Sequence, residues 1–136
     1  MRLAIMVLMA LVCAAQTACV SQHETIPPET RAELIRLGRI ITDENKPEED
    51  RCNTRIRYCD FVRETIEKYG KKSVDRQTVI DSFVVDGRNP QGLMIEVGML
   101  DYMFERRNGT FATLTILFGG WTGSYVQTAY SGAGIP

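Results

Sequence analysis

The spacing of hydrophobic residues changes twice along the chain. Leu3 to Val12 is an unbroken apolar run, and between residues 29 and 69 apolar side chains recur every three or four positions, as on one face of a helix. From about Thr78 the chain is rich in Thr, Val, Ile and aromatic residues, which favour strands. We therefore predict an α+β fold in which two N-terminal helices pack against an antiparallel meander of three or four strands.

The first helix is predicted to begin near Pro28 or Glu29, because proline is tolerated in a first turn and an acidic side chain suits the N-terminal end of the helix dipole. Its buried face is expected to consist of Leu34, Leu37, Ile40 and Ile41. An acidic loop over residues 43–50 follows. The second helix should end at Tyr69-Gly70, since glycine can adopt the left-handed conformation that caps a helix.

The segment after the second helix has an ambiguous pattern. Thr78 to Val85 is predicted to be a strand, bounded by the turn residues Asp86-Gly87 and Asn89-Pro90. Its apolar residues also fit helical spacing, so a helix capped at Gly87 is the competing prediction.

A hairpin is predicted around Asn108-Gly109, which separates the apolar runs Leu93 to Phe104 and Phe111 to Phe118. This dipeptide favours a type I′ turn, and hence a two-residue loop with Arg107 opposite Thr110. In that register Glu105, Met103, Asp101 and Met99 pair with Ala112, Leu114, Ile116 and Phe118. The expected core on this face consists of Val97, Met99, Met103, Ala112, Leu114, Ile116 and Phe118, with Asp101 as its one polar exception.

The opposite face of the hairpin would carry Tyr102, Phe104 and Phe111, with Leu100 and Leu117. Either a helix or the C-terminal tail covers it, or it is a recognition surface, because aromatic residues on a rigid sheet are good anchors for a protein partner.

Trp121, in the glycine-rich segment 119–123, is a further candidate for partner binding, with a lid over the core as its alternative. Residues 124–130 fit a third strand of the meander. Residues 131–136 are expected to form a flexible tail.

The N-terminal segment has the features of an export signal. Arg2 supplies one positive charge, the apolar run ends at Val12, and small residues precede Cys19. The run is only about half as long as the ~20 residues that a helix needs to cross a bilayer. A signal peptide over residues 1–18 is therefore favoured over a permanent span.

The segment Gln16-Thr17-Ala18-Cys19 resembles the lipobox of bacterial lipoproteins, in which a small residue precedes the cysteine that receives the lipid. Gln16 departs from the family pattern, which usually has Leu there. The resemblance implies that Cys19 is acylated and, because Val20 rather than Asp follows, that the protein is an outer-membrane lipoprotein facing the periplasm. Two alternatives stay open: cleavage after Ala14 or Ala15, which gives a soluble periplasmic or secreted protein, and an uncleaved anchor.

Two cysteines in the second helical segment allow two structures. Cys52 and Cys59 share one apolar stripe with Ile56, Val62, Ile66 and Tyr69. Seven residues of helix span about 10.5 Å, too far for a disulfide, whose Cα atoms lie within ~7 Å. Either the helix is continuous and both thiols are buried, or a Cys52–Cys59 disulfide closes a loop and the helix starts at Asp60. Because an exported chain meets an oxidising compartment, we expect the disulfide.

Composition gives little support to catalysis. His23 is the only histidine and lies in the polar tether, residues 19–28, that precedes a single domain over residues 29–130. A His-based triad and a multi-His zinc site are therefore excluded within one chain. Glu96 and Asp101 point to opposite strand faces, and Asp101 and Glu105 lie roughly 13 Å apart. We expect no catalytic residue, no metal site and no cofactor.

The charge distribution does not indicate a nucleic-acid partner. Of the 16 Lys and Arg, Arg2 leaves with the signal, so 15 face 17 Asp and Glu. The pairs Arg55/Arg57, Lys71-Lys72 and Arg106-Arg107 are interpreted as solvated surface.

We expect a non-catalytic envelope lipoprotein that binds another envelope protein through its aromatic sheet face, as an assembly accessory, a pilotin-like chaperone, or an immunity or exclusion factor. The lipid would hold it at the membrane and raise its local concentration near the partner. A periplasmic small-ligand-binding protein is the alternative, and a small carboxylate-dependent hydrolase is a weaker one.

Overall fold

The computed structural model describes residues 26–119 and 125–131. These residues form three helices followed by four strands: α2 (Pro28–Thr42), α3 (Glu48–Tyr69), α4 (Arg76–Phe83), β1 (Leu93–Glu96), β2 (Met99–Glu105), β3 (Phe111–Phe118) and β4 (Tyr125–Ser131). The strands form one antiparallel sheet in the order β1-β2-β3-β4. The predicted α+β class, with helices N-terminal to an antiparallel meander, is confirmed. The leader, Cys19, His23 and Trp121 lie outside the described residues, as do residues 132–136.

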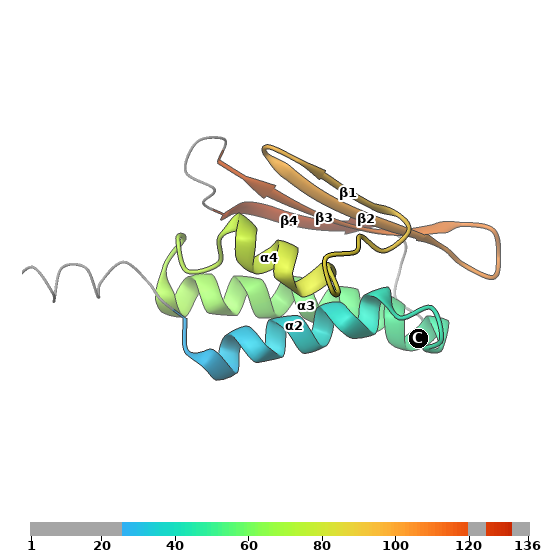
Figure 1. Ribbon diagram of the computed structural model, residues 1–136, viewed down its shortest axis with the longest axis horizontal. Helices are drawn as coiled ribbons and strands as arrows, with labels where there is room; N and C mark the ends of the chain where they lie inside the picture. Colours follow the sequence, from blue (N-terminus) through green and yellow to red (C-terminus); the bar gives the residue numbers. More distant parts are fainter. Residues whose placement is uncertain (1–25, 120–124, 132–136) are drawn as a thin grey trace, which may run out of the picture.

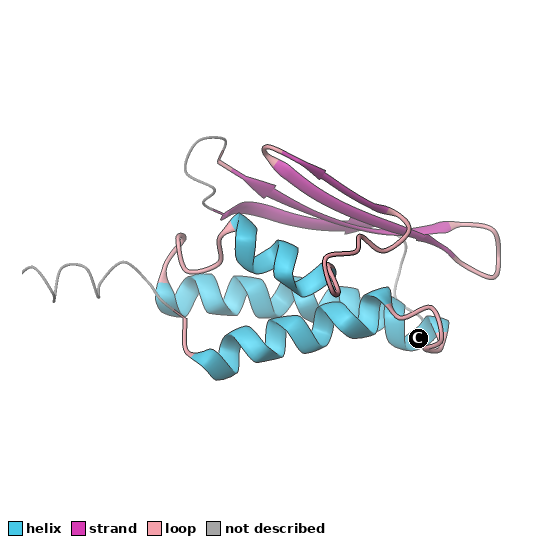
Figure 2. Cartoon of the chain, viewed as in Figure 1, coloured by secondary structure: helices cyan, strands magenta, loops and turns pink. Residues whose placement is uncertain are grey.

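The helices lie together on one side of the sheet, and its other face carries no helix (Figure 1). Figure 2 shows the same division by secondary structure, with the three helices below the four strands. None of the described helices is both long enough and apolar enough to cross a bilayer.

Helix α2 begins as the sequence predicts, with Pro28 in its first turn. Helix α3 ends at Tyr69, followed by Gly70 with a φ of 101°. Between these ends α3 is continuous for 22 residues and passes through both Cys52 and Cys59. The predicted disulfide is therefore wrong. Both cysteines are free thiols, and both are buried together with apolar residues of the same helix face.

Residues 76–83 form helix α4, so the predicted strand at 78–85 is wrong and the competing helix is correct in type. It ends at Phe83 rather than at Gly87. Asp75 caps its start, because the carboxylate accepts hydrogen bonds from the backbone N–H and the hydroxyl of Thr78 at 2.9 and 2.8 Å. Val79 and Phe83, four residues apart, both point into the core.

The β2–β3 hairpin differs from its prediction by one residue. Glu105 pairs with Phe111 rather than with Ala112. The N–H of Gly109 donates to the carbonyl of Arg106 at 2.9 Å, and Gly109 has a φ of 82°. Among the described residues Asp86 is the one non-glycine with positive φ, so Asn108 is not left-handed as a type I′ turn requires. The loop is a type I turn closed by a left-handed glycine, with three residues instead of two.

This one-residue shift exchanges the faces of β2 relative to β3. The buried face combines the predicted core half of β3 with the opposite half of β2: Leu100, Tyr102, Phe104, Ala112, Leu114, Ile116 and Phe118. The helix-free face carries Met103, Asp101 and Phe111. Met103 and Val97 were predicted in the core, but both are exposed.

Aromatic rings connect the two layers. Tyr58 of α3 meets the edge of Phe83 of α4 at 5.2 Å between ring centres, and Phe83 lies 5.9 Å from Tyr102 of β2. All three side chains are buried. Helix α4 therefore joins the longer helix α3 to the middle of the sheet.

Helices α2 and α4 approach each other closely at Gly38. A Cβ atom at this position would lie 2.1 Å from the carbonyl oxygen of Ser82. Arg31 of α2 forms an ion pair with Asp81 of α4 near the same contact. A residue without a side chain is thus required where the two backbones meet.

Candidate functional site

The structure separates the aromatic residues that the sequence predicts as partner-binding. Tyr102 and Phe104 are only 1% and 7% exposed, because the register places them under the helices, whereas Phe111 is 50% exposed. A flat face of all three aromatics is therefore not present at the surface. The alternative prediction, coverage by a helix, describes Tyr102 and Phe104.

These three residues nevertheless meet at one groove of about 500 Å³. It lies where β2 extends past the start of β1, beside the loop between α2 and α3. Its lining consists of Glu44, Arg51, Gln91, Gly92, Tyr102, Met103, Phe104, Glu105 and Phe111. The groove thus has an exposed aromatic residue at its mouth and two nearly buried ones in its wall.

Arg51 of α3 is the one positively charged residue in the lining of this groove, and it is only 9% exposed. Its Nε donates to the carbonyl of Ile41 at 2.9 Å, and its Nη2 donates to the hydroxyl of Tyr102 at 2.8 Å. The guanidinium also lies 4.1 Å from the centre of the Phe104 ring. These contacts fix the side chain in one position across the helix–sheet interface.

Gly92 shapes the wall of the groove beside β2. Its φ is 92°, and a Cβ atom there would lie 2.0 Å from the carbonyl oxygen of Met103. Its own carbonyl accepts a hydrogen bond from the N–H of Met103 at 3.1 Å. The backbone before β1 can therefore lie directly against β2 only because residue 92 is glycine.

A second hollow of about 340 Å³ shares four of these residues and continues toward the hairpin turn. Lys46, Glu48, Arg106 and Arg107 complete its lining. Glu48, the first residue of α3, accepts a hydrogen bond from the backbone N–H of Arg107 and lies 3.9 Å from the Arg106 side chain. The turn is thereby attached to the start of α3. Arg106 is mostly buried, so its interpretation as solvated surface is wrong.

No protein-family model, curated protein or solved structure matches this chain. Function is therefore inferred from the geometry of the chain itself.

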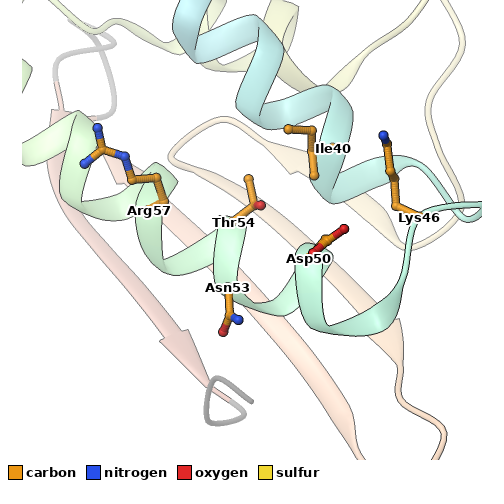
Figure 3. Close-up of a pocket in the computed structure, with 6 residues that line it drawn as sticks. All are labelled: Ile40, Lys46, Asp50, Asn53, Thr54 and Arg57. Carbon is orange, nitrogen blue, oxygen red and sulfur yellow. The ribbon is translucent and has the colours of Figure 1, made fainter. Parts of the chain in front are cut away.

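Another hollow, of about 300 Å³, is lined by residues of α2, of α3 and of the loop between them. Figure 3 shows its lining: Ile40, Lys46, Asp50, Asn53, Thr54 and Arg57. The polar side chains spread apart in the close-up rather than converging on one point. This surface does not bring together an acid, a base and a nucleophile.

The carboxylates considered at the sequence level lie apart from these hollows or at their rim. Asp101 is on the helix-free face, where it accepts a hydrogen bond of 2.6 Å from the hydroxyl of Thr115. Glu96 is exposed on β1, and Glu105 lines the groove. Within the described residues, no three His, Cys, Asp or Glu side chains lie close enough to hold a metal ion.

Sequence reasoning missed the two buried arginines of α3. Arg55 is fully buried and donates from Nη1 to the carbonyl of Thr113 at 2.7 Å, so its interpretation as solvated surface is wrong. Burial lowers the pKa of Arg55, an effect that the Cys52 thiol opposes, but a guanidinium keeps its charge in proteins. Arg51 and Arg55 lie four residues apart, on the same face as Cys52 and Cys59. That spacing was a signal that both arginines face the sheet.

The buried thiols should be chemically inert in the folded protein. Burial raises the pKa of Cys59 to about 11, so the thiol stays protonated throughout the neutral range, and only the thiolate is a nucleophile. We expect iodoacetamide to leave Cys52 and Cys59 unmodified from pH 7 to pH 9 and to label both after unfolding in guanidinium. Peptide mapping by mass spectrometry measures this. A peptide pair joined by a disulfide, or labelling of Cys59 that rises with pH below 9 in the folded state, would contradict the continuous buried helix.

Proposed function

We propose that this protein is a non-catalytic lipoprotein of the bacterial outer membrane that faces the periplasm and binds another envelope protein at the groove beside the β2–β3 hairpin. The observation that carries the proposal is the exposure of Phe111 next to Met103, at the mouth of a groove whose wall contains Tyr102 and Phe104. Exposed aromatic and methionine side chains beside a preformed hollow are typical anchors of protein interfaces.

The direction of the chain supports a role at a membrane surface. Helix α2 starts at the end of the domain opposite the β2–β3 hairpin (Figure 1). A lipid on Cys19 would therefore attach the domain by one end and leave the groove at the other end accessible. Tethering raises the local concentration of the groove near a partner in the same envelope.

Phe111 should be required for partner capture. We expect Phe111→Ser to abolish cross-linking to the envelope protein that wild type captures, because the largest exposed anchor of the groove is removed. Leu117→Ser is the matched control: Leu117 is an exposed apolar residue on the same face of the same strand, six residues away and roughly 20 Å along β3.

The measurement is quantitative mass spectrometry of cross-linked envelope material, with circular dichroism to establish that both variants fold. Recovery of the same protein by wild type and Leu117→Ser, but not by Phe111→Ser, supports the proposal. Equal recovery by all three variants would remove the groove from the interface.

The size of the groove favours a second candidate, the binding of a small ligand. A volume of about 500 Å³ lies within the range of ligand sites in proteins, and the lining combines aromatic side chains with a few polar groups. The candidates differ in whether a free small molecule occupies the groove without a protein partner.

A further inference from the structure

Arg51 forms no ion pair with a carboxylate of the described residues. Its side chain contacts a backbone carbonyl, a phenol and an aromatic ring, all of them uncharged. The ion pairs seen among the described residues include Arg31–Asp81, Arg36–Glu33, Arg57–Glu64, Arg63–Asp60 and Arg106–Glu48, and none of these involves Arg51. An arginine residue that is 91% buried without an anion is unusual, because removing its charge from water is costly.

The side chain also retains hydrogen-bond donors that point to a ligand. A guanidinium has five N–H groups, and the described residues accept from one on Nε and one on Nη2. The Nη1 group has no acceptor in the described part of the chain. Because Arg51 lines both hollows, a ligand in the groove can reach it.

Tyr102 supplies a second donor at the same place. Its hydroxyl oxygen accepts from Arg51, so its own hydrogen is left to donate. Burial raises the pKa of Tyr102, an effect that Arg51 opposes, and the phenol therefore keeps this hydrogen at neutral pH.

We propose that the guanidinium of Arg51 and the hydroxyl of Tyr102 bind a carboxylate group, while the apolar group attached to that carboxylate lies against Phe111 and Met103. This inference deepens the proposed function, on which it rests for the location of the interface, by stating what the partner or ligand presents to the groove. The carboxylate would offset the charge of Arg51, and its planar shape matches the fork of a guanidinium.

The rest of the lining selects a singly charged ligand. Glu44 and Glu105 are exposed and also border the groove. Their negative charges repel an anion more strongly as its charge increases, so a phosphate monoester is disfavoured relative to a carboxylate. Lys46 and Arg107 line the adjoining hollow but not the groove, and their positive charges attract an anion at longer range.

The test is a titration of the purified full-length protein with N-acetyl-Gly-Ala-Phe as the free acid and as the C-terminal amide, followed by two-dimensional NMR. We expect the acid to bind roughly tenfold or more tightly than the amide, because the amide lacks the charge that Arg51 requires. Saturable shifts should include the Tyr102 and Phe111 amides. Equal affinity of acid and amide, or no saturable shift with millimolar acid, overturns the proposal.

Variants separate this chemistry from mere folding effects. Tyr102→Phe keeps the buried ring and should weaken binding of the acid by roughly three- to tenfold, with no change for the amide. Arg51→Lys keeps the charge but loses the planar guanidinium, and should weaken binding of the acid by roughly tenfold. Arg57→Gln on the exposed face of the same helix is the control and should leave both affinities unchanged. Wild-type affinity in both groove variants, with their folds intact by circular dichroism, overturns the proposal.

The same titration with N-acetylphenylalanine distinguishes the source of the carboxylate. Binding of the single residue as tightly as the tripeptide indicates a small acid, and a clear preference for the tripeptide indicates a C-terminal chain end; both outcomes support carboxylate recognition.

The inference and the proposed function can fail separately. If Phe111→Ser loses partner capture but wild type binds acid and amide equally, only the proposed recognition of a carboxylate is rejected. A tenfold preference for the acid with no captured partner rejects only the envelope partner.

Discussion

Replacing Gly38 with alanine should destabilise the protein by about 2–3 kcal/mol and lower its melting temperature by roughly 10 °C or more. The added methyl group would lie 2.1 Å from the carbonyl oxygen of Ser82, so α2 and α4 must move apart. Alanine is a better helix former than glycine by about 1 kcal/mol, and in the absence of the contact the substitution would stabilise α2. The sign of the change therefore tests the close approach directly.

Two comparisons sharpen this experiment. Arg39→Ala, at the exposed neighbouring position of α2, should change the free energy of unfolding by less than about 0.5 kcal/mol. Trimming Ser82 to alanine in the Gly38→Ala background should give no rescue, because the nearest obstructing atom is backbone oxygen rather than side chain. A Gly38→Ala protein more stable than wild type in urea denaturation would show that the helices do not meet there.

The two longer helices could be predicted because several independent signals agree. Helix α2 has an apolar face at helical spacing and Pro28 in its first turn, and α3 ends before a glycine with positive φ. Each signal is local in sequence, and local propensity and burial favour the same structure. Elements of this kind need no information from the rest of the fold.

Helix α4 could not be assigned from apolar spacing alone. Val79, Ile80 and Phe83 suit a buried strand by residue type and a helix by spacing. The deciding signal was Asp75, which caps the N-terminus by accepting from the backbone of Thr78. An acceptor side chain just before an ambiguous apolar run is thus more informative than the β-branched residues within it.

The hairpin register depended on a choice that local sequence does not make. Asn108-Gly109 is compatible with a two-residue type I′ loop and with the observed three-residue loop in which only the glycine is left-handed. The two differ by one residue, and that difference decides whether Tyr102 or Met103 faces the helices. The choice is made by burial: the observed register places the Tyr102 ring of β2 against Phe83 and buries Phe104.

The difference between contacts that are local in sequence and contacts that are not also explains why the candidate site was only partly predicted. The aromatic residues Tyr102, Phe104 and Phe111 were identified from their proximity on one hairpin, and the structure brings all three to the groove. Arg51 was missed because it is 51 positions from Tyr102 in the sequence, and only the packing of α3 on the sheet joins their polar atoms. A charged residue on a mostly apolar helix face was the one local sign of this contact.

The packing of Phe83 between the helices and the sheet leads to the second prediction with a large expected effect on stability. Phe83→Ala should destabilise the protein by about 4 kcal/mol, because a fully buried ring is lost together with its edge contact to Tyr58 and its contact to Tyr102. Urea denaturation monitored by circular dichroism measures the change.

Phe111→Ala is the matched control: it removes the same side chain from a half-exposed position and should cost less than about 1 kcal/mol. Similar losses of unfolding free energy in the two variants would contradict the observed β2–β3 register. In the register shifted by one residue, Phe83 would lack its contact with the Tyr102 ring, and Phe111 would have other neighbours on β2. Because Phe83 packs against Tyr102, whose hydroxyl accepts a hydrogen bond from Arg51, Phe83→Ala should also weaken carboxylate binding at a temperature where the variant remains folded.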